Sequence, residues 1–237
     1  MGLLTISNIK LMKSEKGGFG YRSVGLSLAP NIMNSKRINI CGKNSDSCTR
    51  NCLVFSGFNS MSINSKIKKT DMFLSDRVGF MRKIIVELGY QYELAKLDGL
   101  QLSCRMNLYS DLNFMNLKVD GKTIYEWYPQ MQHIEYTRYW NRYSKFPNLH
   151  YTYSADKANV TDEDIIKQCK KGLNVAMIYR GKLPTEWNGI PCINGDISDL
   201  RNTDPKGVIV ALKHKNSIVK GISNDKLLEN NTIIYNF

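Results

Sequence analysis

Three of the six cysteines, Cys41, Cys48 and Cys52, fall within twelve residues of one another. The segment that holds them is polar and rich in Gly, Ser and Asn, so it has little apolar surface with which to order itself. Thiolates that bind a metal ion or an iron–sulfur cluster would supply that order. A free cysteine is often a small buried hydrophobe, but three cysteines in a polar loop fit that role poorly. The pattern C-x6-C-x3-C therefore predicts a thiolate-ligated metal centre.

The spacing of the three cysteines favours one kind of centre over another. Structural zinc sites usually combine a short C-x2-4-C knuckle with a second, distant pair of ligands, and this loop has a different pattern. Three thiolates suit a [4Fe-4S] cluster in which one iron stays open for water, a substrate or a nucleotide-like cosubstrate. We expect Cys41, Cys48 and Cys52 to bind such a cluster, with a structural zinc or no metal as the alternatives.

A second group of polar residues follows the expected β-strands. Each strand runs into a polar or charged side chain at or just after its C-terminal end. In β/α barrels, binding and catalytic groups converge at the C-terminal rim. Polar residues are common in any loop, so the repetition along the chain carries this prediction. The candidate rim residues are Arg105, Asn107, Asp111, Glu135, Ser154, Asn194 and Asp196.

The remaining motifs point less directly to a reaction. Eight aromatic residues lie between Tyr125 and Phe146, together with Arg138 and Arg142, and such a group could stack nucleic-acid bases or simply pack. The three histidines are dispersed and form no H-E-x-x-H pair, which argues against a histidine-built zinc hydrolase. The chain also lacks the P-loop motif and the G-x-S-x-G motif.

The apolar patterns predict the elements that would position these residues. A first strand is expected over 23–28, and residues 37–41 form a second short strand or a rigid entry to the cysteine loop. Residues 59–69 have the composition of a polar linker, and an apolar stripe predicts one long helix from 71 to about 96. Further strands are expected over 100–106, 131–137, 149–153, 173–179, 190–193 and 207–213, with short helices over 122–127 and 162–171.

Strands that alternate with helices are typical of parallel crossovers, so the fold class is α/β. About seven strands in 237 residues favour a small or incomplete β/α barrel, with the cysteine loop after an early strand. The hydrophobic content of 42% is that of a globular protein. We expect residues 1–22 to be a flexible lead-in and 23–237 to form a single barrel-like domain.

The charge of the chain suggests anionic partners. The formal net charge is +12, which favours nucleic acid or phosphorylated metabolites. The basic residues are spread out, however, and the densest group, Lys66, Lys68 and Lys69, is short. No apolar run approaches the roughly 20 residues that span a bilayer, so no membrane partner is expected. The N-terminus has no secretory pattern, which predicts a cytoplasmic protein with reduced thiols.

Several ordered blocks of the sequence span about residues 37–215 and include 105–111, 133–137, 149–154, 174–178, 193–196 and 207–213. In their order along the chain, these blocks resemble the phage "gene product 88" family. This resemblance implies a viral or prophage origin, with the host cytoplasm as location, and no particular reaction.

The cysteine loop also resembles, more loosely, that of radical S-adenosylmethionine enzymes. Those enzymes place three cysteines after the first strand of a partial β/α barrel, and the open iron of their cluster binds the cosubstrate. The resemblance implies that Cys41, Cys48 and Cys52 hold the cluster and that S-adenosylmethionine binds beside it. Two features depart from that superfamily: its usual spacing is C-x3-C-x2-C, and this chain has no clear Gly-Gly-Glu segment.

These observations lead to two classes of function. The first is a phage-type iron–sulfur protein, with a radical S-adenosylmethionine-like reaction as its implied activity. The second is a basic protein that binds nucleic acid or a host target, with a structural zinc or without metal. Salt-dependent nucleic-acid binding would distinguish the second class from the first.

Overall fold

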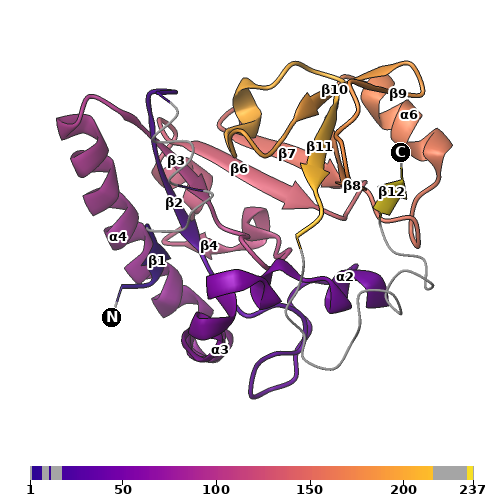
Figure 1. The fold of residues 1–237 in the computed structure, drawn as a ribbon. Helices are drawn as coiled ribbons and strands as arrows, with labels where there is room; N and C mark the ends of the chain where they lie inside the picture. The colour runs from indigo at the N-terminus through magenta and orange to yellow at the C-terminus, as the bar shows by residue number, and fades with distance from the viewer. Residues whose placement is uncertain (1, 7–10, 12–17, 216–233, 237) are drawn as a thin grey trace.

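One ten-stranded sheet organises the molecule (Figure 1). The computed structural model describes residues 2–6, 11, 18–215 and 234–236. The strands lie in the spatial order β1 (Leu4–Thr5), β2 (Tyr21–Leu26), β3 (Gln101–Arg105), β6 (Gln132–Thr137), β7 (Leu149–Ser154), β8 (Val175–Arg180), β11 (Ile209–Lys213), β10 (Ile190–Asn194) and β9 (Glu186–Trp187). A tenth strand, β12 (Ile234–Asn236), pairs with β8.

The sheet is mostly parallel, which confirms the α/β class in a single domain. The pairs from β2 through to β10 are parallel, and the outermost strands β1 and β9 are antiparallel to their neighbours. From β2 to β8 the order in the sheet follows the order in the chain. Among the described residues no pairing joins β1 to β9, so the sheet is open, and a barrel is not confirmed.

The N-terminal segment takes part in the sheet. Leu4 and Thr5 form β1 within the segment expected to be a flexible lead-in, and Leu3 and Leu4 are buried. The backbone N–H groups of Leu3 and Leu4 donate to the carboxylate of Glu87 at 2.8 Å. The prediction for residues 7–10 and 12–17 lies outside the described residues.

Two helices replace the single long helix that the sequence predicts. They are α3 (Ile63–Ser75) and α4 (Arg77–Leu97), and they are separated at Asp76, whose side chain accepts a hydrogen bond from Gly79 N at 2.8 Å. This contact caps α4. The linker expected over 59–69 is wrong, because these residues form the 3-10 helix η2 (Gly57–Ser62) and the first half of α3. The buried side of α3 carries Lys66, Lys69 and Thr70, which hides the apolar period in the sequence.

The helices cover one face of the sheet. In Figure 1, α4 lies along the end that holds β2 and β3, and α6 (Asp162–Lys170) lies at the opposite end. Ile84 and Leu88 of α4 belong to the same buried core as Leu102 of β3, and Ile165 of α6 extends that core. The other short elements are the strands β4 (Lys118–Val119) and β5 (Lys122–Thr123), helix α5 (Ile124–Trp127) and the 3-10 helices η3 (Phe114–Asn116) and η4 (Arg201–Thr203).

The cysteine loop leaves the C-terminal end of β2. It contains the short helix α2 (Asp46–Arg50) and is followed by η1 (Leu53–Phe55). Residues 37–41, expected to be a strand or a rigid entry, form no strand. Figure 1 shows α2 facing the arrowheads of the parallel strands. Because the C-terminal ends of parallel strands meet at one edge, the loop lies where residues after β3, β6 and β7 can reach it.

Candidate functional site

Cys41 is fixed between two loops at the C-terminal edge of the sheet. Its Sγ accepts a hydrogen bond from Asn31 N at 3.0 Å and donates to the carbonyl oxygen of Tyr109 at 3.4 Å. Next to it, Asp111 N donates to the carbonyl oxygen of Ile40 at 3.0 Å. The start of the cysteine loop is therefore held by the loop that follows β3.

Cys48 lies in α2, which is attached to the end of β7. The Oγ of Ser45 caps this helix by accepting from Cys48 N at 3.0 Å. The same hydroxyl donates to Asp156 Oδ2 at 2.6 Å, two residues beyond the end of β7. Cys52 follows α2 after one intervening residue, Asn51. The second and third cysteines are thus positioned by a contact between residues 111 apart in the chain.

The three thiols lie close enough to affect one another electrostatically. Burial raises the pKa of Cys41 to about 12, with the N–H of Asn31 opposing the rise and Cys52 and Cys48 acting in the same direction as burial. Burial also raises the pKa of Cys52 to about 11, with Cys48 acting in the same direction. Burial raises the pKa of Cys48 too, whereas the guanidinium of Arg138 lowers it. The thiols are therefore protonated at neutral pH and share one environment.

This arrangement is not a preformed metal site. In the part of the chain that the structure describes, no three His, Cys, Asp or Glu side chains are grouped closely enough to hold a metal ion. The type of donor fits a cluster, since three thiols lie in one loop beside a cation. Ligation would require the thiols to lose protons and move closer together.

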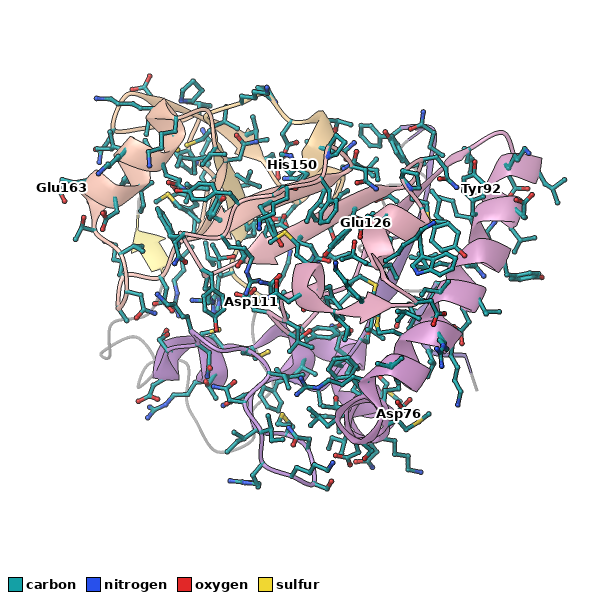
Figure 2. All side chains as sticks on the ribbon, turned by 180° about the vertical axis from the view of Figure 1, so that it is seen from behind. Asp76, Tyr92, Asp111, Glu126, His150 and Glu163 are labelled. Atoms are coloured by element: carbon teal, nitrogen blue, oxygen red, sulfur yellow. The ribbon has the colours of Figure 1, made fainter. Side chains whose placement is uncertain are left out.

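Two buried ion pairs lie between the sheet and the cysteine loop. Asp111 Oδ1 accepts from Arg142 Nη1 at 2.6 Å, and its carboxylate also accepts from Arg138 N at 2.8 Å and from Thr137 Oγ1 at 3.0 Å. Arg138 forms the second pair with Asp156, whose side chain is 2% exposed. Figure 2 shows Asp111 between the sheet and α2.

Arg138, Arg142 and Asp156 were not among the residues that the sequence singled out for the rim. Arg138 directly follows β6 and Asp156 follows β7 by two residues, so both residues fit the strand-end pattern from which the rim was predicted. Arg142 stands five residues after β6 and had no such signal. The two arginines were instead noted for a role in base stacking.

Glu135 lies beneath this edge and is fully enclosed. Its carboxylate accepts from Met106 N at 2.8 Å and from Asn107 N at 3.0 Å. Burial raises the pKa of Glu135 to about 7, although Arg105 and these N–H donors oppose the rise. Asn107 in turn accepts from Ser110 Oγ and Leu112 N, both at 2.8 Å. Both predicted rim residues thus shape the loop after β3.

Arg105 and Ser154, two further candidate rim residues, each have contacts within the fold. Arg105 Nη1 lies 3.6 Å from Asp199 Oδ2, and its guanidinium lies 4.4 Å from the centroid of the Tyr136 ring. Strand alternation places Arg105 on the face of the sheet opposite Cys104 and the helices. The backbone oxygen of Ser154 accepts from the indole N–H of Trp140 at 3.2 Å.

Asn194 and Asp196 belong to a separate part of the edge. They lie at and after the end of β10, which is four strands from β6 in the sheet, or roughly 19 Å at about 4.8 Å per strand. Asp196 Oδ2 accepts from Lys213 N at 2.8 Å, and Oδ1 lies 3.2 Å from Lys215 Nζ. The structure therefore does not bring these two residues to the cysteines.

A cleft of about 670 Å³ opens beside the cysteine loop. Three loops line it, with residues from 39–42, 111–116 and 139–146. Gly42, next to Cys41, forms part of its wall with Tyr139. The guanidinium of Arg142 lies 4.3 Å from the centroid of the Tyr139 ring, so the Asp111–Arg142 pair packs against that ring in the lining of the cleft.

Gly42→Ala is expected to distort the cysteine loop more than the change in backbone conformation alone would. Gly42 has φ +65°, and an added Cβ would lie 1.7 Å from Tyr139 Oη. Gly99→Ala is the matched control, because Gly99 has φ +69° and no atom within 4 Å of the added Cβ. Thermal unfolding should show a larger fall in Tm for Gly42→Ala, with partial recovery in Gly42→Ala/Tyr139→Phe. Equal falls for the two alanine variants would contradict the Gly42–Tyr139 contact.

Comparisons with known proteins give one match. A family model described as Gene product 88 matches residues 3–228. No curated protein and no solved structure matches the chain. No helix among the described residues is long and apolar enough to cross a membrane.

Proposed function

The chain belongs to the phage gene product 88 family, and we propose that it is an iron–sulfur protein of that family. In this proposal Cys41, Cys48 and Cys52 bind a [4Fe-4S] cluster at the C-terminal edge of the sheet, in the cytoplasm of the host cell. The family description names no reaction, so the proposal rests on the residues of this chain.

One observation carries the proposal: the fold holds one polar loop that contains three cysteines at the edge where the parallel strands end. Cys41 is fixed by Asn31 and Tyr109, and Ser45 at the start of α2 is attached to Asp156, so the loop is anchored at its first cysteine and again between Cys41 and Cys48. The pKa of Cys41 is raised by Cys52 and Cys48, and the pKa of Cys52 is raised by Cys48, so the three thiols are electrostatically coupled. To bind one metal centre, the three thiols would have to lie closer together than they do among the described residues of this structure.

The ionisation of the three thiols determines how a metal centre would bind. Burial raises the pKa of all three thiols, so their protonated forms dominate at neutral pH without metal. A bound cation stabilises thiolates, and Arg138 acts in the same direction on Cys48 and Cys52. Binding would release protons and strengthen as the pH rises. A zinc ion with the same three thiolates is the alternative centre.

The arrangement of the strands supports the finer fold within the proposal, an incomplete β/α barrel. Strands β2 to β8 lie in chain order and in parallel, with the cysteine loop after the first of them. A cluster there would supply electron transfer, and the open iron would offer a place for S-adenosylmethionine. Asp111 and Asn107 would shape the surroundings of the centre through the loop after β3.

The structure argues against nucleic-acid binding by the densest cationic group of the sequence, which is Lys66, Lys68 and Lys69. Lys66 and Lys69 are buried, and Lys66 Nζ donates to the carbonyl oxygen of Asn59 at 2.9 Å. Lys69 Nζ donates to the carbonyl oxygen of Leu3 at 2.7 Å. Of the three lysines only Lys68 is exposed, so this group is not a surface patch for a phosphate backbone.

Alkylation under anaerobic conditions tests the proposal residue by residue. Protein reconstituted with iron and sulfide is treated with iodoacetamide, and the modified cysteines are mapped by mass spectrometry. We expect protection of Cys41, Cys48 and Cys52 that is lost after chelation, with Cys192 as the matched control because it is also partly exposed but lies on β10. Equal modification of all four cysteines with and without iron would contradict the proposal.

A further inference from the structure

We propose that the cleft beside the cysteine loop binds a nucleoside phosphate. Its volume of about 670 Å³ is in the range of small-ligand sites, which is roughly 300–1,000 Å³. The inference concerns the cleft itself and does not depend on a metal at the cysteines. It rests on the charge, the aromatic rings and the carboxamides of the lining.

The charge of the lining favours an anion. Asp111 is the only carboxylate among the lining residues, and its oxygens already accept from Arg142, Thr137 and Arg138. Arg142 is neutralised by that pair, which leaves Lys145 as the uncompensated charge of the lining. Lys43 adds a second cation at the side, with its Nζ 5.8 Å from the centroid of the Tyr139 ring. Phosphate groups match this balance.

The aromatic residues of the cleft offer a surface for a base. Tyr143 lines the cleft and is 49% exposed, so its ring is available to a ligand. Tyr139 and Phe146 also line it, and Phe146 is supported from behind by Tyr125 at 5.2 Å between ring centroids. Stacking on tyrosine tolerates every base, because every base has a π face.

The carboxamides explain why a nucleoside fits better than a simple anion. Asn116 and Asn141 line the cleft, and their side chains make no hydrogen bond within the part of the chain that the structure describes. A carboxamide offers both a donor and an acceptor, as the edges of bases do. The other two asparagines of the lining have structural partners: Asn39 accepts from Cys41 N at 2.9 Å, and Asn113 accepts from Met115 N at 3.1 Å.

The aromatic segment noted in the sequence therefore divides into two roles. Tyr125 is buried, and Tyr128 and Trp140 donate to the backbone oxygens of Ile85 and Ser154. These residues belong to the packing of the sheet. Tyr139, Tyr143 and Phe146 instead reach the cleft, and they carry the capacity for stacking.

Isothermal titration of the full chain with ATP, GTP, CTP and UTP tests the inference directly. At least one nucleotide should bind. Tyr143→Ala should weaken the affinity for that nucleotide by about 5-fold or more. The separate variant Lys145→Gln should also weaken this affinity, and more so at low salt. Tyr90→Ala is the matched control, because Tyr90 is 64% exposed on α4 away from the cleft. Lys170→Gln on α6 is the control for charge.

Further titrations distinguish a free nucleotide from a nucleic-acid strand as the ligand, and a nucleoside phosphate from a simple anion. Tighter binding of a ten-nucleotide single strand than of free nucleotides would identify a strand end as the source of the nucleoside phosphate. Inorganic phosphate that binds as tightly as the nucleotides would overturn the inference. So would the absence of binding, or equal weakening by Tyr143→Ala and Tyr90→Ala. The titrations are run before and after chelation, so their outcome is independent of any metal at the cysteines.

Discussion

Asp111→Ala is expected to lower the free energy of unfolding by about 3–5 kcal/mol, because it leaves a buried guanidinium without its counter-charge. The side chains of Asp111 and Arg142 are each 8% exposed. The same change removes the acceptor of the part-buried Arg138 N and of the buried Thr137 Oγ1. A buried donor that loses its acceptor adds to the loss of stability. Urea denaturation of the wild type and of Asp111→Ala measures the difference in free energy of unfolding, provided that both proteins show the same dependence on urea concentration.

A double variant and a surface control identify the cause of this loss. Asp111→Ala/Arg142→Met should recover part of the stability, because the uncompensated charge is then absent. Arg82→Ala breaks the surface pair between Arg82 and Asp120, whose side chains are 58% and 55% exposed, and should leave the unfolding curve close to that of the wild type. A loss for Asp111→Ala no larger than that for Arg82→Ala would refute the role of the buried pair.

Arg138→Leu is expected to affect both stability and the chemistry of the cysteine loop. It leaves Asp156, which is 2% exposed, with Ser45 as its remaining side-chain partner in the described residues, and should cost about 3 kcal/mol. It also removes the cation that lowers the pKa of Cys48, so less thiolate is present at a given pH. The rate of alkylation of Cys48 without metal should therefore fall.

The second readout separates the electrostatic role of Arg138 from a purely structural one. Arg138→Leu/Asp156→Asn should recover stability while leaving the alkylation of Cys48 slow, since the cation is still absent. If alkylation of Cys48 stays at the wild-type rate in both variants, Arg138 does not act on the thiol. Lys43→Leu is a useful control, because Lys43 is an exposed cation in the same loop.

The strands could be predicted from the sequence because burial leaves a pattern in it. A strand buried on one face alternates apolar and polar residues, and a strand buried on both faces is a short apolar run. The expected strands over 131–137 and 149–153 correspond to β6 and β7 within a residue. The break at Asp76 could not be seen in the same way, because the apolar stripe continues through it and only the cap with Gly79 reveals it. The sequence also could not predict whether the sheet is open or closed into a barrel, since closure depends on whether the two edge strands pair with each other.

The sequence predicted single residues of the candidate site, but it did not predict which of them lie near one another. Asp111 and the three cysteines come together because β2, β3 and β6 are neighbours. Asn194 was also predicted from its place at a strand end. In the sheet, however, β11 lies between β8 and β10, which moves Asn194 away from the cysteines. The order of strands in the sheet differs here from their order in the chain, and no local sequence pattern predicts that difference. The buried pairs of Arg138 and Arg142 were hidden because charged residues next to aromatic ones also suit an exposed surface.

Metal and sulfide content measures the central claim most directly. The wild type, Cys48→Ala and Cys192→Ala are purified without oxygen, and iron, acid-labile sulfide and zinc are quantified per chain. The account predicts about four iron and four sulfide per chain in the wild type and in Cys192→Ala, and a loss of both in Cys48→Ala. Stoichiometric zinc without sulfide, or neither metal in the wild type, would contradict the [4Fe-4S] centre.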